Sequence, residues 1–127
     1  MATTITNGIR IEVKSSFLPE RSNPPKPLFV FAYHITITND GNHPVKLKDR
    51  YWHITDANGN IEEIRGPGVV GNQPRLQNND IFEYTSYCPL PTAFGVMKGA
   101  FRMIRDSGES FLAKIDPFKL SVPFSVN

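Results

Sequence analysis

The chain has 127 residues, a formal net charge of +2 and a 39% hydrophobic fraction, which suits one domain with a single core. No segment gathers basic residues and no apolar run reaches membrane-spanning length, which argues against a nucleic-acid partner and against membrane insertion. The single cysteine, Cys88, has no internal disulfide partner, and the N-terminal residues lack the pattern of a signal peptide, so we expect a soluble cytoplasmic protein.

Alternating apolar and polar residues predict strands in the first third of the chain. Residues 8–16 alternate cleanly, with two isoleucines and a valine on one face. Residues 18–27 contain four prolines and are expected to form an extended, exposed crossover. Residues 28–39 give the strongest strand prediction, because aromatic and β-branched side chains share one face. A turn at 39–42 then ends this strand.

The next segment predicts a bent strand followed by a hairpin. Residues 44–56 fit one bent strand or a strand pair, and the parity of the apolar positions shifts between Leu47 and Trp52, which indicates a bulge between them. Asn58-Gly59 predicts a tight hairpin turn, and residues 60–65 form the return strand. Trp52 is expected to anchor the core between two sheets.

The second half predicts three more strands. Residues 80–86 alternate, and residues 87–92 are expected to form a non-helical loop because they contain two prolines. Residues 95–106 and 110–118 predict two strands joined by a Ser-Gly turn. Residues 120–127 are expected to be a frayed extension at a sheet edge.

These elements predict an all-β fold. About seven or eight strands with regular turn signals, and no helical pattern, favour an antiparallel β-sandwich of the immunoglobulin or fibronectin type III kind. A small closed barrel is the alternative. The whole chain, 1–127, is expected to be a single domain with its core between about residues 8 and 120.

A glycine-rich loop, Arg65–Gly71, is the most distinctive motif. Gly66, Gly68 and Gly71 have the Gly-x-Gly-x-x-Gly spacing of dinucleotide-binding loops, which require a strand before the glycines and a helix after them. A strand precedes the motif, but residues 72–80 lack helical periodicity, and Pro67 removes one N–H donor. The sequence therefore favours a structural loop over a phosphate site.

No catalytic or metal-binding pattern is found. His34, His43 and His53 are far apart without ligand spacing, although a cross-sheet pair of His34 and His53 stays open. Cys88 has no neighbouring base and is expected to be a buried, inert thiol. The acids at 62–63 point to opposite faces of one strand. We therefore predict no catalytic residue, no metal ligand and no cofactor, which leaves a binding module as the default.

Three segments carry a resemblance to a known family. They read Ile54-Thr55-Asp56-Ala57-Asn58-Gly59, then Glu63-Ile64-Arg65-Gly66-Pro67-Gly68-Val69-Val70-Gly71 followed by Gln73-Pro74, then Phe82-Glu83-Tyr84-Thr85-Ser86 followed by Cys88-Pro89-Leu90-Pro91-Thr92. Together they resemble the ApaG family, over about residues 8–120. The resemblance implies a fibronectin type III-like sandwich, a bacterial protein linked to cobalt and magnesium efflux or resistance, and no established enzymatic activity. Similar domains in eukaryotic F-box and polymerase-interacting proteins are taken as protein-interaction modules.

Two functional hypotheses follow. The first is a non-enzymatic protein-interaction module whose contact surface combines the loops 65–74 and 87–95, with Arg65 and Phe94 as contact residues. The second is a small-ligand site for pyrophosphate, a nucleotide or a divalent cation on Gly66, Gly68 and Gly71, where the resemblance also suggests a pyrophosphate site. The sequence leaves the partner and the oligomeric state open.

Overall fold

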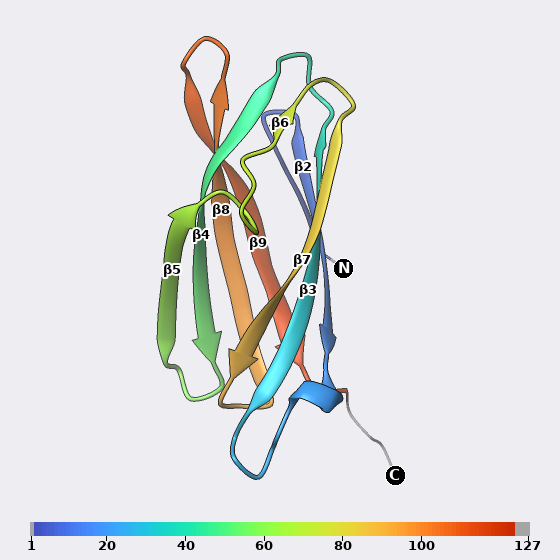
Figure 1. Cartoon of the computed structure of the whole chain (residues 1–127). Helices are drawn as coiled ribbons and strands as arrows, with labels where there is room; N and C mark the ends of the chain where they lie inside the picture. Colours follow the sequence, from blue (N-terminus) through green and yellow to red (C-terminus); the bar gives the residue numbers. More distant parts are fainter. Residues whose placement is uncertain (1, 124–127) are drawn as a thin grey trace.

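The computed structural model describes residues 2–123, which form two antiparallel sheets packed face to face (Figure 1). The first sheet has the order β1-β2-β3-β7, and the second has the order β5-β4-β8-β9, with β6 also paired to β4. The elements are β1 (Ala2–Thr6), β2 (Ile9–Phe17), the 3₁₀ turn η1 (Pro19–Arg21), β3 (Phe29–Asn39), β4 (Val45–Asp56), β5 (Ile61–Pro67), β6 (Arg75–Leu76), β7 (Ile81–Leu90), β8 (Phe94–Arg105) and β9 (Ser110–Ser121). The predicted antiparallel β-sandwich is confirmed.

Two of the nine strands were absent from the sequence prediction. One is the two-residue β6, and the other is β1, which pairs with β2. Asn7 and Gly8 connect β1 to β2 with φ values of 46° and 82°, the left-handed conformation that a tight type I′ hairpin turn requires at both positions. An Asn-Gly hairpin signal was therefore present in the sequence.

The core lies between the sheets and is centred on Trp52. This side chain is 2% exposed and makes edge-on contacts with Tyr33, Phe101 and Phe118, whose ring centroids lie 5.4, 6.0 and 6.0 Å from its own. Tyr33 comes from the first sheet and the other two rings from the second. The expected role of Trp52 as the anchor between sheets is confirmed, since aromatic pairs in this geometry add to the energy of burial.

Three local expectations are wrong in part. Residues 87–90 continue β7 and pair with β3, because β7 is the edge strand of its sheet and Pro89 needs no N–H on the open side. Leu120 is fully buried in β9 and belongs to the core, and Ser121 ends the strand, while residues 124–127 lie outside the described residues. The crossover at 18–27 contains η1 but is otherwise exposed, as expected.

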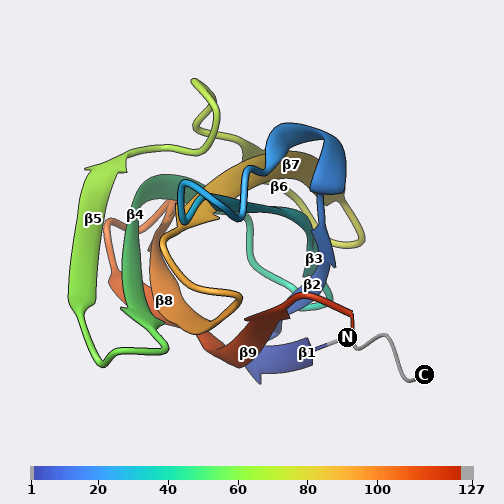
Figure 2. The same ribbon diagram turned by 90° about the horizontal axis from the view of Figure 1, so that it is seen from below.

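The two long sides of the sandwich differ (Figure 2). On one side β1 and β9 lie together, and the hydroxyls of Thr4 and Thr6 accept hydrogen bonds from the backbone N–H groups of Asp116 and Lys114. On the other side β5 stands as the outermost strand of the second sheet, apart from β7. The open side is where the glycine-rich loop lies.

The predicted bulge in β4 is confirmed. The register between β4 and β8 shifts between Leu47 and Asp49, which leaves Lys48 as the extra residue. β6 pairs with β4 before this position, at Val45 and Lys46, and β5 pairs along the same edge of β4 after it, from Asp49 to Thr55. The bulge therefore lies where the glycine-rich loop, between β5 and β6, departs from this edge of β4.

Candidate functional site

The glycine-rich loop connects β5 to β6, and its two ends come together at Lys48. The carbonyl oxygen of Lys48 accepts two hydrogen bonds, one from the N–H of Gly68 at 2.9 Å and one from the Nε2 of Gln73 at 2.8 Å. Between these ends, Val69 and Asn72 exchange N–H···O bonds of 2.8 and 2.9 Å. Val69 is 1% exposed and belongs to the core cluster, so its side chain anchors the loop.

Each glycine of the motif has a structural reason. A Cβ on Gly68 would lie 2.3 Å from the carbonyl oxygen of Asn72, and its φ is +61°. Gly71 has a φ of +81° with open space around it, so it is needed for its backbone conformation alone. At Gly66 the backbone is not left-handed, and the atoms nearest to an added Cβ are not backbone atoms. A Cβ there would nevertheless lie 2.9–3.0 Å from the guanidinium of Arg50. The spacing of the motif is thus explained without a ligand.

The loop has few free donors for a phosphate. The N–H groups of Gly68, Val69 and Asn72 already donate to backbone carbonyls, and Pro67 has no N–H. After Gly71 the chain continues through Asn72–Pro74 into β6 rather than into a helix. In the described chain this motif therefore lacks the helix N-terminus on which a dinucleotide-binding loop depends, and three of its amides are already used.

Arg50 holds the base of the loop. Its Nη1 donates to the carbonyl oxygens of Pro67 and Gly68, both at 3.0 Å. Arg50 shares the parity of Trp52 on β4, so the side chain begins on the inner face and reaches the loop at the open side of the sandwich. A guanidinium satisfied by two carbonyls stabilises a sharp backbone bend at this position.

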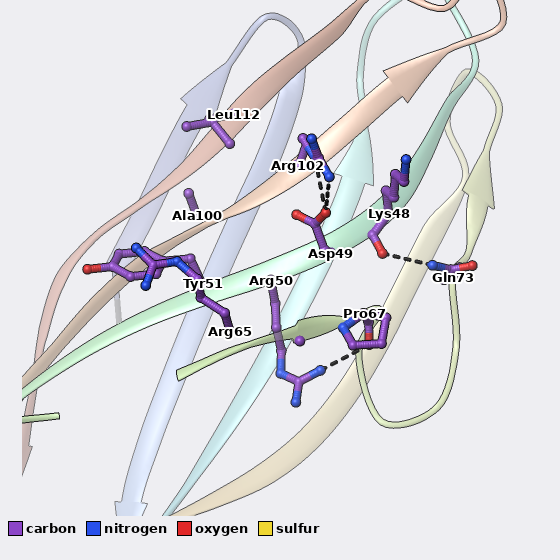
Figure 3. Close-up of a pocket in the computed structure, with 11 residues that line it drawn as sticks. Lys48, Asp49, Arg50, Tyr51, Arg65, Pro67, Gln73, Ala100, Arg102 and Leu112 are labelled. Atoms are coloured by element: carbon purple, nitrogen blue, oxygen red, sulfur yellow. Dashed lines mark hydrogen bonds and ion pairs between the residues drawn. The ribbon is translucent and has the colours of Figure 1, made fainter. Parts of the chain in front are cut away.

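A groove of about 830 Å³ lies beside the loop on the outer face of the second sheet (Figure 3). Its wall is formed by residues of β4, β5, β8 and β9 and by Gln73, which lies just before β6. The lining residues are Lys48, Asp49, Arg50, Tyr51, Arg65, Gly66, Pro67, Gln73, Ala100, Arg102 and Leu112. This volume lies within the usual range for ligand and peptide sites.

One cross-strand row of the groove is aromatic and cationic. Tyr51 on β4 is paired with Arg65 on β5 and with Ala100 on β8. The guanidinium carbon of Arg65 lies 4.6 Å from the centroid of the Tyr51 ring, a cation–π contact, and Arg65 also lies 3.5 Å from Glu63. Tyr51 donates a 2.8 Å hydrogen bond to the carboxylate of Glu63, which raises the pKa of the tyrosine hydroxyl. The row is thus fixed by its own contacts.

The neighbouring row combines an ion pair with an exposed leucine. Asp49 on β4 is opposite Arg102 on β8, and Arg102 is opposite Leu112 on β9. The Nε of Arg102 donates to Asp49 at 3.0 Å, and Leu112 remains 54% exposed. Four of the residues that line the groove are basic and one is acidic, so the groove has an excess of positive charge.

The residues singled out from the sequence fall in two places. Arg65 and Gly66 line the groove, and Gly68 and Gly71 belong to the adjacent loop. Phe94 begins β8 and is opposite Ser121, beyond the end of β4, whereas Arg65 is opposite the middle of β4. The structure therefore does not bring Phe94 to the groove, and the loops 65–74 and 87–95 do not form one continuous surface there.

Tyr51, Arg102 and Leu112 were missed by the sequence reasoning. Each occupies a position on the outer face of its strand, which the alternation of polar and apolar residues marks only as exposed. Their neighbourhood depends on the pairing of β4 with β8 and of β8 with β9. Asp49 and Arg102 are 53 residues apart in sequence, so no local signal could have joined them.

The histidines and the cysteine lie elsewhere. His34 is on the outer face of the first sheet, where it contacts Thr85 at 2.8 Å and Glu83 at 3.1 Å, and His53 is on the second sheet. The contacts from His34 and Thr36 lower the pKa of Glu83. Burial raises the pKa of the Cys88 thiol to about 11. Among residues 2–123 no group of three His, Cys, Asp or Glu side chains is placed to hold a metal ion, and no helix is long and apolar enough to span a membrane.

Comparison with known proteins gives a consistent result. The profile of the family described as "ApaG domain" matches residues 19–105. "Protein ApaG" from Anaeromyxobacter dehalogenans (strain 2CP-C) is 50% identical over 127 residues, which is 100% of both chains, and "Protein ApaG" from Beijerinckia indica is 47% identical over 98% of this chain and 96% of its own. The crystal structure of a putative ApaA protein from Bordetella pertussis is 42% identical, with a TM-score of 0.89 over 92% of this chain and 95% of that one. The chain therefore belongs to the ApaG domain family.

Proposed function

We propose that the protein is a non-enzymatic interaction module of the cytoplasm that binds another protein in the groove of the second sheet. The observation that carries this proposal is the composition of the groove: the exposed apolar side chain of Leu112 lies next to Arg102 in one cross-strand row, and Tyr51 and Arg65 are paired in the neighbouring row. Tyrosine and arginine around an apolar patch are typical of the residues that dominate protein–protein binding energy. Any part in cobalt and magnesium efflux is then indirect, through the partner.

The rigidity of the site supports binding. The loop is closed by hydrogen bonds at Lys48, and Arg65 and Arg102 are each held by a contact within the groove. Side chains and loops that are already ordered lose less conformational entropy when a partner docks. The excess of basic side chains points to a partner surface that combines an apolar anchor with carboxylates.

A matched pair of variants tests the proposal. Leu112→Asp places a carboxylate in the groove, and Ile81→Asp makes the same change on the first sheet at a similarly exposed position, 59% against 54%. Proteins captured from a bacterial extract by the immobilised wild type should also be captured by Ile81→Asp and be lost with Leu112→Asp. The binding of one captured protein, repeated in purified form, should weaken as salt rises. Equal capture by Leu112→Asp and the wild type would remove the groove as the site.

A small-ligand site on the glycine loop has less support, because the amides of Gly68, Val69 and Asn72 are already used and no helix follows the motif. We expect titration with pyrophosphate, diadenosine tetraphosphate or cobalt to leave the amide resonances of Gly66, Gly68 and Gly71 unmoved at millimolar concentration. Specific, saturable shifts at these three glycines would favour the ligand over the partner protein.

A further inference from the structure

β5 is an open sheet edge. It is the last strand of the second sheet, every residue from Ile61 to Arg65 is exposed, and Ile61 and Ile64 are apolar and 60% and 37% exposed. In the described part of the chain the other edges are covered or interrupted. β1 and β9 are joined through Thr4 and Thr6, and β7 contains Pro89. An edge with free backbone groups is a template for another strand.

The hydrogen bonds define which groups of β5 are free. The pairs of β4 and β5 alternate between hydrogen-bonded and non-hydrogen-bonded positions. The N–H of Asp56 donates to Asn60, and the N–H of Gly68 donates to Lys48, so the even-numbered residues of β5 face β4. The backbone groups of Ile61, Glu63 and Arg65 therefore point outward, away from β4 and from the rest of the sheet.

The side chains of this edge are self-complementary in one register only. We propose that β5 pairs antiparallel with β5 of a second copy of the chain, with Ile64 of the two copies directly opposite each other. In this register Glu63 of each copy lies opposite Arg65 of the other. Registers centred on Glu62, Glu63 or Arg65 place like charges opposite each other at the two-fold axis, which destabilises the pairing. Charge complementarity thus selects both the occupant and the register.

The resulting dimer has a definite geometry. Residues directly opposite in an antiparallel pair lie on the same face, so the outer faces of both copies lie on the same side of one continuous sheet. The order of strands is β9-β8-β4-β5 followed by the same strands of the second copy in reverse. Both grooves then open on one side, flanking the two-fold axis. The contact is a short strand pair, so the dimer is weak and depends on concentration.

Charge exchange tests the pairing directly. Sedimentation velocity from about 10 µM to about 1 mM at low salt should show a monomer–dimer equilibrium for the wild type, in the range expected of a small interface. Glu63→Arg alone and Arg65→Glu alone should each weaken dimerisation about tenfold or more, since both cross-strand pairs become like-charged. The double variant with both changes should regain the wild-type equilibrium. A monomer at every concentration, or a double variant no better than the single ones, would overturn the proposal.

Cross-linking tests the register. In a Cys88→Ser background, Ile64→Cys places two thiols at a non-hydrogen-bonded pair, with Cα atoms about 4.5 Å apart, where a disulfide can form. Glu62→Cys is the matched control, because its two copies lie about 13 Å apart in this register. Rapid oxidation of Ile64→Cys to a dimer and slow oxidation of Glu62→Cys is the expected result; the reverse would refute the register.

This inference does not depend on the groove partner. Leu112→Asp should dimerise like the wild type. Ile64→Asp places two carboxylates opposite each other at the two-fold axis and changes no residue that lines the groove, so it should lose the dimer and still capture whatever protein binds the groove. Failure of one proposal therefore leaves a different signature from failure of the other.

Discussion

Replacing the three glycines of the loop one at a time should separate a structural motif from a ligand-binding one. Gly71→Ala forces an alanine into φ of +81° in open space, which costs about 1 kcal/mol for the left-handed conformation alone. Gly68→Ala carries the same cost at φ of +61° and also places its Cβ 2.3 Å from the Asn72 carbonyl oxygen. The backbone at Asn72 cannot move away from this Cβ without opening the loop, so Gly68→Ala should lose the two hydrogen bonds between Val69 and Asn72.

The expected costs follow from these contacts. Two backbone hydrogen bonds at about 1 kcal/mol each, added to the conformational term, give about 3 kcal/mol for Gly68→Ala. Gly66→Ala must displace the Arg50 guanidinium from the carbonyls of Pro67 and Gly68, which should cost about 1–2 kcal/mol. Gly71→Asn should be nearly neutral, because asparagine tolerates the left-handed region.

Urea unfolding at equilibrium measures these differences. The midpoint should fall most for Gly68→Ala, by at least twice the shift seen for Gly71→Ala, with an unchanged m value. A phosphate-binding loop predicts a different outcome, in which all three alanine variants fold with similar stability and differ in ligand affinity. If Gly68→Ala is no less stable than Gly71→Ala, the structural explanation of the motif is refuted.

Four further predictions concern the core and the buried polar groups. Trp52→Ala should destabilise the protein by about 3–5 kcal/mol in denaturant unfolding, because it removes the ring that contacts both sheets. Asn39→Ala should cost about 2–3 kcal/mol, since the buried amide donates to His43 and Leu76 and accepts from Gly41, and pairs left unsatisfied are costly. Cys88 should resist iodoacetamide at pH 8 until urea is added, because burial raises its pKa from 9.0 to about 11. The folded state holds the thiol proton more tightly, so stability should fall as pH rises from about 9 to about 11, and Cys88→Ala should reduce that slope.

The inward face of the sandwich was predictable from the sequence because burial leaves a local period of two. The isoleucines of β2, the alternating apolar residues of β3 and the shift of parity at the β4 bulge all appear in the structure as the sequence predicts. Trp52 could be assigned to the core for the same reason. Each of these inferences needs only residues that are adjacent along the chain.

The failures arise where the outcome depends on a partner strand. Pro89 is tolerated in β7 because the backbone nitrogen at this position faces the open edge, where no N–H is needed. Nothing in the sequence shows which strands are edges. The outer row of Asp49, Arg102 and Leu112 exists because β4, β8 and β9 are neighbours in a given register. The groove was therefore invisible for a physical reason: an exposed alternating residue has no sequence period that identifies its cross-strand neighbours.

The glycine motif shows how a functional signature can have a structural origin. A Gly-x-Gly-x-x-Gly spacing states only where a side chain is excluded or where the backbone is left-handed, as at Gly71, and an excluding group lies elsewhere in the chain. Here the excluding groups are the Arg50 guanidinium at Gly66 and the Asn72 carbonyl at Gly68. Because Arg50 also binds the carbonyls at the end of β5, the same contacts that require glycines keep β5 in register on β4. The loop thus supports one wall of the groove and the open edge beside it, so the conformational demands of the motif serve two surfaces without any bound phosphate.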